Sequence, residues 1–237
     1  MSGIIQIVMS NVPVVVPVPV LYYDPSNSSS YPGTGTTINS LAPTNLTGAM
    51  SNITYTNPYF TYNGSNATMS VSDNSLLEPG AGDFTLEAWV YYSAIAGSSR
   101  VIVGKTDGGQ AADWGYGIRT GSNGGTYFEV GNGTTSTTSP SYTVSTGQWY
   151  HIVGVWTNIS ANTIELYING VSQGSNSHSF TSVKNSTRPL SFGSFDGGAT
   201  FGQWFNGRMG IYRQYNSALS AAQVGVNYNT TKGIYGL

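Results

Sequence analysis

Glutamates are the residues of this 237-residue chain best suited to acid–base chemistry, and three of them lie within apolar stretches. Glu87, Glu129 and Glu165 each stand alone in their stretch. Hydrolysis of a glycosidic bond needs two carboxyl groups that flank the bond to be broken. The isolated spacing predicts that these glutamates pair locally within the fold and that the chain is not an enzyme. A carboxylate pair assembled from different strands is the alternative that the spacing leaves open.

Nucleophilic and metal-binding chemistry has little support in the sequence. The chain has no cysteine, which removes thiol nucleophiles, disulfides and cysteine-ligated metal sites. His151 and His178 lie far apart in unlike surroundings, and we expect His151 to pack at a sheet edge with its ring nitrogens hydrogen-bonded. No cofactor and no metal are predicted. Loop carboxylates at Asp107, Asp113 and Asp196 remain the alternative for a cation site.

The charge pattern argues against a nucleic-acid partner. Charged residues make up 8% of the chain, the net charge is −2, and the eight Lys and Arg residues are scattered. Binding of nucleic acid through several phosphates needs clustered cations.

Two tryptophans lie in stretches predicted to be loops, next to Gly, Asp and Gln residues. An exposed aromatic ring can stack on the face of a sugar ring, and polar groups beside it can form hydrogen bonds with the sugar's hydroxyls. Trp114 and Trp204, with their neighbours Asp113 and Asn206, are therefore the candidate glycan-binding residues. The alternative is that both indoles fold back over the rim of the domain.

The elements that must position these residues are short β-strands. In residues 84–90, apolar side chains recur at every second position, as in a strand with one buried face. Similar strands are predicted over 67–72, 100–105, 116–120, 126–130, 149–157, 163–168, 190–195 and 208–215. Asn169-Gly170 predicts a two-residue hairpin turn, and Ser220 with Gln223 predicts a capped short helix. The pattern predicts an all-β, two-sheet antiparallel jelly-roll sandwich with one short C-terminal helix.

Residues 1–21 form a separate segment, ahead of one domain over residues 22–237. Pro13, Pro17 and Pro19 interrupt its apolar run, which excludes a membrane-spanning helix, and it lacks the pattern of a secretory signal. We expect an extended arm whose apolar side chains are buried against another protein, because free exposure would favour aggregation. The predicted assembly residues are Ile4, Ile5, Ile7, Val8, Val14, Val15, Val16, Val18 and Val20.

Four stretches resemble, in order and spacing, concanavalin A-like or laminin-G-like jelly rolls. They read F-T-L-E-A-W-V at 84–90, Q-W-Y-H-I-V at 148–153, I-E-L-Y-I-N-G at 164–170, and F-N-G-R at 205–208 followed by Y-N-S-A-L-S at 215–220. The resemblance covers about residues 55–237 and implies two antiparallel sheets, one of them concave. It supports the predicted fold without fixing a function.

The resemblance also bears on catalysis and on calcium. Hydrolases of this fold carry E-x-D-x-E along one strand, and no such motif occurs here. Relatives that bind calcium carry F-D-G-x-D-D-Y where this chain has Y-N-G-S-N-A-T at 62–68, which contains no carboxylate. An I-D-E motif of the family is replaced by Met209-Gly210-Ile211. Since calcium prefers charged oxygen ligands, no calcium is expected at the family's site.

The C-terminal stretch from residue 215 to 237 resembles the end of concanavalin A-like domains in structural proteins of tailed phages, with differences at Ser217 and Gln223. This resemblance implies a non-enzymatic virion protein, as a capsid decoration or a fibre or tail component. The arm would anchor it to other virion proteins or join it into a homo-oligomer, and the jelly roll would project outward. The alternative is a carbohydrate-binding module that recognises glycans of the host surface. No membrane insertion is expected.

Overall fold

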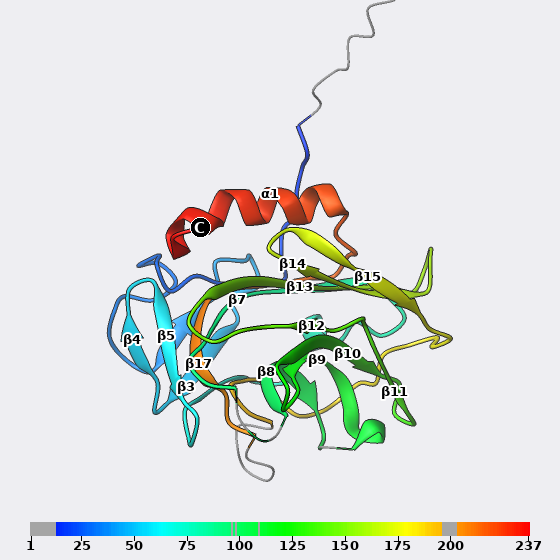
Figure 1. Ribbon diagram of the computed structural model, residues 1–237, viewed down its shortest axis with the longest axis horizontal. Helices are drawn as coiled ribbons and strands as arrows, with labels where there is room; N and C mark the ends of the chain where they lie inside the picture. The colour runs from blue at the N-terminus through cyan, green and yellow to red at the C-terminus, as the bar shows by residue number, and fades with distance from the viewer. Residues whose placement is uncertain (1–12, 96, 98, 109, 196–202) are drawn as a thin grey trace, which may run out of the picture.

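Alternating apolar and polar side chains fold most of the chain into antiparallel strands, which stack as two sheets (Figure 1). The computed structural model describes residues 13–237 except 96, 98, 109 and 196–202. The predicted all-β sandwich with one short C-terminal helix is confirmed.

Each sheet is described by the order of its strands. In the described residues, sheet A runs β15 (Val171–Ser177), β14 (Thr163–Ile168), β13 (Trp149–Thr157), β7 (Phe84–Tyr92), β17 (Asn206–Tyr215), β5 (Tyr59–Asn63) and β4 (Thr54–Thr56), with β1 (Leu21–Tyr23) also paired to β17. Sheet B runs β11 (Ser136–Thr138), β10 (Gly125–Gly131), β9 (Trp114–Thr120), β8 (Arg100–Thr106), β16 (Leu190–Phe192), β6 (Thr68–Val71), β3 (Thr47–Ser51) and β2 (Thr37–Asn39), with β12 (Tyr142–Thr143) beside β10. Three 3-10 turns are described, η1 (Ser75–Leu77), η2 (Ala111–Asp113) and η4 (Lys232–Tyr235).

The local sequence signals explain the bounds of several elements. Strands β13 and β14 have the bounds predicted from the sequence, and the turn between β14 and β15 places Asn169 at φ 51° and Gly170 at φ 80°. Both angles lie in the left-handed region that this turn requires. Helix α1 (Ala221–Thr231) begins after Ser220, whose hydroxyl accepts the Gln223 N–H in the predicted capping box.

The main hydrophobic core fills the space between the two sheets. It takes the inward side chains of β7, such as Phe84 and Leu86, and those of β9 and β10, such as Tyr116 and Phe128. Burial of this apolar surface is the main force that holds the sheets together.

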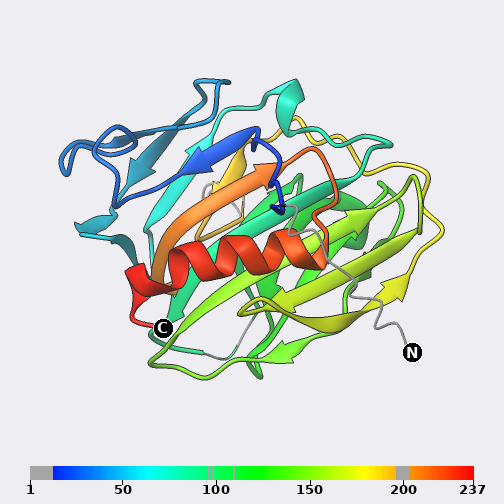
Figure 2. The ribbon, with the colours of Figure 1, turned by 90° about the horizontal axis from the view of Figure 1, so that it is seen from above.

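A second apolar layer lies on the outer face of sheet A, under α1. Figure 2 shows the helix lying across this sheet. Val224 of α1 packs with Val153 and Tyr167 of the sheet, and Trp89 stacks on Tyr235 at 4.5 Å between ring centroids. The outer face of sheet A is therefore covered along the helix, whereas the outer face of sheet B carries no helix of its own among the described elements (Figure 1).

The described part of the arm runs alongside the start of α1. The Val20 N–H donates to the Gln214 carbonyl oxygen, Gln223 Nε2 donates to the Val15 carbonyl oxygen, and Val16 packs on the apolar layer under the helix. The arm thus leaves the domain on the side of sheet A that bears α1 (Figure 1).

Only part of the predicted assembly segment is described. Ile4, Ile5, Ile7 and Val8 lie outside the described residues. Val16 and Val20 are half-buried against the domain, and Leu21, the last residue of the predicted arm, is fully buried in β1. The exposed valines of the arm are Val14 at 44%, Val15 at 77% and Val18 at 70% exposure.

Candidate functional site

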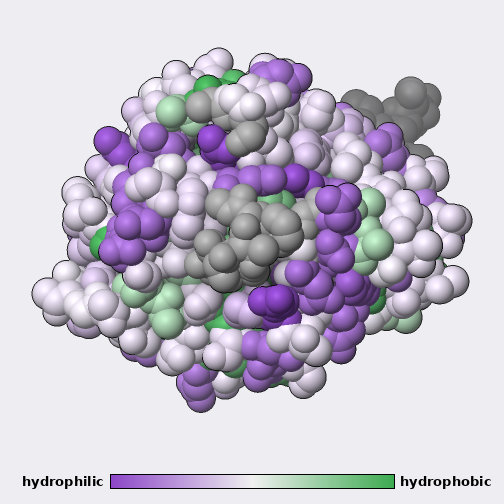
Figure 3. All heavy atoms as spheres, turned by 90° about the horizontal axis from the view of Figure 1, so that it is seen from below, coloured by the Kyte–Doolittle hydropathy of each residue, from purple (hydrophilic) through white to green (hydrophobic). Residues whose placement is uncertain are grey.

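The outer face of sheet B, which bears no helix among the described elements, carries a group of aromatic and charged side chains around Trp114. The Trp114 indole lies over β8 and β9, where a Cβ added at Gly117 would stand only 3.0 Å from its Cζ3. The Arg119 guanidinium stacks above the indole at 4.6 Å from the ring centroid. Arg119 Nη1 also donates to Glu129 Oε2 at 2.7 Å. In Figure 3, which views the molecule from this side, most of the described surface is pale, of intermediate hydropathy, with separate purple patches of hydrophilic residues.

Carboxylates are scarce on this sheet. Glu129 is the single acidic residue in the described strands of sheet B. Its two oxygens already accept hydrogen bonds, one from Arg119 and the other from the Ser136 hydroxyl at 2.7 Å. The described strands therefore offer no pair of carboxyl groups for glycoside hydrolysis here.

The four predicted glycan-binding residues do not lie together on one sheet. Trp114 begins β9 and is 1% exposed, so the prediction of an exposed loop indole is wrong. Residues of sheet B and the cation above it enclose the ring, which leaves no face for a sugar. Asp113 belongs to η2, where Oδ2 accepts the Gln110 N–H. Trp204 is half-buried in a segment without regular structure, and Asn206 begins β17 in sheet A.

His151 lies in β13, which has neighbours on both sides, so its predicted position at a sheet edge is wrong. Its ring is fully buried beneath α1, and Nε2 donates to Glu87 Oε1 at 3.1 Å. Nδ1 has no hydrogen-bond partner among the described residues. The histidine is part of the packing and does not reach solvent.

Glu87 is the centre of this buried network. Its carboxylate accepts bonds from Arg213 Nη1 and Asn227 Nδ2, both at 2.6 Å, and from the Tyr215 hydroxyl at 3.3 Å. Burial acts to raise the pKa of Glu87, but the Arg213 guanidinium and the bonds from His151 and Asn227 outweigh it and lower the pKa to about 2. The network connects α1 to sheet A through the bond from Asn227 to Glu87, and the buried Glu87 carboxylate is not accessible to a substrate.

The loop carboxylates have structural partners as well. Asp107 pairs with Lys184 at 3.0 Å and accepts the Ser186 hydroxyl. Asp196 lies outside the described residues. Across the part of the chain that is described, no three His, Asp or Glu side chains gather as a metal site. No described helix is long and apolar enough to cross a membrane.

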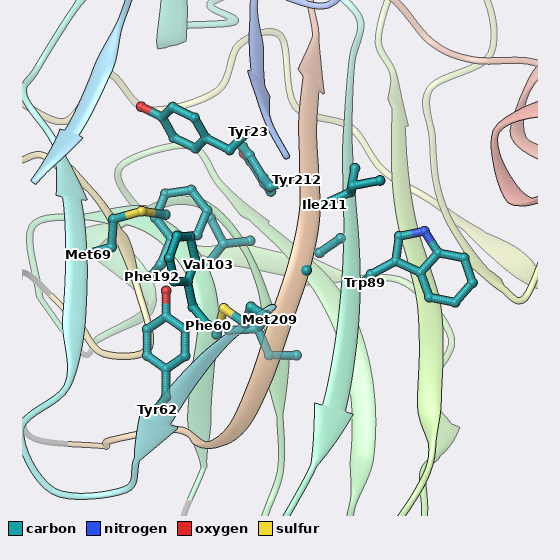
Figure 4. A pocket seen from close by; sticks show the side chains of 13 residues that line it. Tyr23, Phe60, Tyr62, Met69, Trp89, Val103, Phe192, Met209, Ile211 and Tyr212 are labelled. Carbon is teal, nitrogen blue, oxygen red and sulfur yellow. The ribbon is translucent and has the colours of Figure 1, made fainter. Parts of the chain in front are cut away.

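An enclosed cavity of ≈ 10 Å³ lies in the interior, lined by Tyr23, Phe60, Tyr62, Phe192 and other apolar side chains (Figure 4). The Tyr62 hydroxyl has no hydrogen-bond partner among the described residues. A cavity of this volume admits at most one water molecule, so it is not a ligand pocket.

Two open hollows lie beside residues 179–181, and the first of them lies where β15 of sheet A meets β11 of sheet B. Asn176 Nδ2 donates to the Thr138 carbonyl oxygen at 2.8 Å and joins the two edges. The first hollow, ≈ 410 Å³, is lined by Ser136, Thr137, Ser177, His178, Ser179 and Phe180. The second, ≈ 280 Å³, shares Ser179 and Phe180 and is lined further by Asn158, Asn162 and Thr181.

The sequence analysis did not single out this edge. The stretch from 177 to 181 alternates hydroxyl and aromatic side chains, S-H-S-F-T, which is the one signal in the sequence that could have drawn attention to it. The residues across the hollow come from β11 and are about 40 positions away in the chain, as the Asn176–Thr138 separation of 38 indicates.

The chain matches known proteins at the level of family and fold. The sequence profile of the concanavalin A-like lectin/glucanases superfamily matches residues 63–225. No curated protein matches the chain.

Among the solved structures with a similar fold are binding domains of botulinum neurotoxins and of Paraclostridial Mosquitocidal Protein 1. The binding domain of Paraclostridial Mosquitocidal Protein 1 has a TM-score of 0.71 at 16% identity, covering 92% of this chain and 55% of that domain. The botulinum neurotoxin serotype D binding domain has a TM-score of 0.69 at 14% identity, covering 90% and 52%. The binding domain of botulinum neurotoxin DC, solved with SialylT and with rat synaptotagmin II, has a TM-score of 0.67 at 12% identity, covering 90% and 51%. This chain spans about half the length of each of them, and at such identities the likeness shows the fold.

Proposed function

Because the chain belongs to the concanavalin A-like lectin and glucanase superfamily, we propose that it is a lectin-like domain that binds carbohydrate without cleaving it. The superfamily's name covers both binders and hydrolases, so the residues of this chain must decide between them.

The arrangement of the carboxylates carries the proposal. Hydrolysis of a glycosidic bond by the usual route needs a proton donor and a nucleophile or base on either side of the bond. Glu129, alone among the described strand residues of sheet B, is held by Arg119 and Ser136. Glu87 is fully buried under α1. Neither of these two glutamates is placed to work with a second carboxylate. Asp73 and Glu78 do lie close together, but both pair with Lys105 Nζ, at 2.7 and 2.6 Å.

Similarity to toxin binding domains supports binding as the activity. One of these domains has been solved with SialylT and with a protein, rat synaptotagmin II. In that toxin domain the fold therefore binds both SialylT and a protein. For this chain we favour carbohydrate, because the open hollows at the sheet edges are lined by hydroxyls, amides and aromatic rings.

A glycan array tests the proposal directly. The full chain, labelled with a fluorophore, should bind a related subset of the immobilised glycans and give no signal for the others. The Ser179→Arg variant, which fills a hollow with a charged chain, serves as a matched comparison on the same array. Uniform background on every glycan would refute the carbohydrate ligand.

A second proposal concerns the structure to which the domain is attached. We propose that the chain is a virion component attached through its N-terminal arm, either to another virion protein or to further copies of itself. One observation supports attachment through the arm: Val14, Val15 and Val18 expose their side chains ahead of a packed domain. Full burial of one valine contributes about 1.5–3 kcal/mol, so a partner that covers all three would gain several kcal/mol.

Light scattering on the full chain and on a chain that starts at Leu21 tests the self-association. If the arm joins copies of the chain, the full chain should form a defined oligomer and the shortened chain should be a folded monomer. Monomers in both samples would refute self-association through the arm. Co-sedimentation with virions that lack the chain then tests attachment to another protein, and equal attachment of both forms would contradict the anchoring role.

A further inference from the structure

His178 extends the aromatic core of the sandwich to its surface at the β15–β11 edge. Its imidazole stacks on the fully buried Trp156 indole with centroids 3.6 Å apart and planes 13° apart. Phe180 lies 6.1 Å from both rings. His178 and Phe180 are half-buried, and both line the larger hollow. The planes of His178 and Phe180 are tilted by 52°, so the edge offers an aromatic floor of two inclined rings that is continuous with the core through Trp156.

Hydrogen bonds fix this floor in place. His178 Nε2 lies 2.9 Å from the Thr157 carbonyl oxygen, and Nδ1 accepts the Phe180 N–H at 3.2 Å. Since a carbonyl can only accept, the proton is on Nε2 and the ring is neutral. Burial lowers the pKa of His178 and keeps the ring neutral near pH 7. A fixed, uncharged ring loses little conformational entropy when a ligand stacks on it.

Hydroxyl groups surround the aromatic floor. Ser136 and Thr137 approach it from β11, and Ser177 and Ser179 from the end of β15 and the segment after it. The Ser136 hydroxyl donates to Glu129, which leaves its oxygen able to accept a bond from a ligand. No charged residue lines either hollow. A lining of hydroxyl groups without charged side chains favours a neutral ligand that carries many hydroxyls.

The edge is less suited to a peptide that adds a strand. The pairing of β14 with β15 shifts register between Glu165 and Tyr167, and Gly174 in β15 has φ 97°. Strand addition relies on an even row of free N–H and C=O groups along an edge. A bulge and a left-handed residue interrupt that row.

We infer that the β15–β11 edge is the sugar-binding site of this domain, with a pyranose ring stacked on His178, flanked by the inclined ring of Phe180, and its hydroxyls bonded to Ser136, Ser177 and Ser179. The inference rests on the proposed function and names the site for it. A sugar ring pairs an apolar face of C–H groups with polar rims, which matches an aromatic floor with hydroxyl walls. The second hollow, which shares Ser179 and Phe180 with the first, offers Asn158, Asn162 and Thr181 to the next sugar unit. The ligand class is a neutral oligosaccharide of two or more units.

Amide NMR on the 15N-labelled full chain tests the site. The probes are lactose, maltotriose, cellotriose and N,N′-diacetylchitobiose, each titrated at pH 7. At least one probe should shift the amide signals of residues 177–181 and 136–138 in a saturable way. The Phe180→Ala variant should lose affinity at least tenfold. Because Phe180 also packs against the core, the exposed Ser179→Arg provides a variant that blocks the hollow without removing core contacts.

Thr56→Arg is the matched control, since Thr56 is exposed in β4 at the opposite edge of sheet A. It should bind the active probe like the wild type, whereas Ser179→Arg should lose binding at least tenfold. Shifts that gather at Trp204 and Asn206, with unchanged affinity of Ser179→Arg, would overturn the edge site and leave carbohydrate binding in place. If no probe shifts any signal of the wild type, both the carbohydrate ligand and the site are refuted.

Discussion

Removing the Arg213 guanidinium should destabilise the domain more than a change at an ordinary strand position. Arg213 Nη1 lies 2.6 Å from Glu87 Oε1, and both side chains lie beneath α1. An Arg213→Met variant keeps much of the side-chain volume but leaves Glu87 charged in the interior. Its remaining donors are then His151, Asn227 and the Tyr215 hydroxyl. Breaking a buried pair in this way costs about 3–5 kcal/mol.

Urea unfolding at pH 7 measures the free energy of unfolding of the wild type, Arg213→Met, Glu87→Gln and the double variant. We expect the double variant to be less destabilised than the sum of the single variants, by about 0.5–3 kcal/mol, because Glu87→Gln removes the stranded charge. A loss below about 1 kcal/mol for Arg213→Met, or strictly additive losses, would refute the reasoning.

The same network predicts a loss of stability in acid. The pKa of Glu87 is about 2 in the folded chain, against 4.5 for an ordinary glutamate. Because the folded pKa is the lower one, its contribution is fully present above about pH 4.5 and is lost as the pH falls toward about 2. At 1.36 kcal/mol per pKa unit the contribution is about 3 kcal/mol. Glu87→Gln should lack this pH dependence, and equal acid sensitivity of both proteins would contradict the assignment.

Two further substitutions test local geometry by the same urea assay. Gly117→Ala should lower the free energy of unfolding by about 1–3 kcal/mol, because its Cβ would stand 3.0 Å from Trp114 Cζ3 and closer still to a backbone oxygen. As a control, the Cβ of Gly225→Ala in α1 meets nothing within 4 Å, so this variant should not be destabilised. Equal effects of the two substitutions would contradict the packing of the Trp114 indole against Gly117. Asn169→Ala should cost about 1–2 kcal/mol, because it removes the acceptor of the His151 N–H and forces a φ of 51° on alanine; an unchanged unfolding curve would contradict the turn.

The sequence was sufficient to predict the fold because its signals are local. Alternation fixes which face of each strand is buried, and the Asn169-Gly170 turn sets the register of β14 against β15. The capping box at Ser220 sets the start of α1. None of these signals depends on a distant residue.

The site was harder to predict because it depends on contacts between distant residues. Trp114 is flanked by loop-forming residues, yet the indole is buried because glycines in β8 and β9 leave room for it and Arg119 lies above it. In the sequence His178 resembles an isolated loop residue, and only the structure shows that it stacks on Trp156 of β13. Local patterns carry no information on such contacts.

Frontal affinity chromatography with mass detection tests the central claim most directly, since it measures both retention and integrity of a saccharide. The full chain is immobilised, and the neutral oligosaccharide probes are passed over it at pH 7. The account predicts that at least one probe is retarded and leaves the column with its mass unchanged. Appearance of shorter saccharides would contradict binding without cleavage, and absence of retardation for every probe would contradict carbohydrate binding itself.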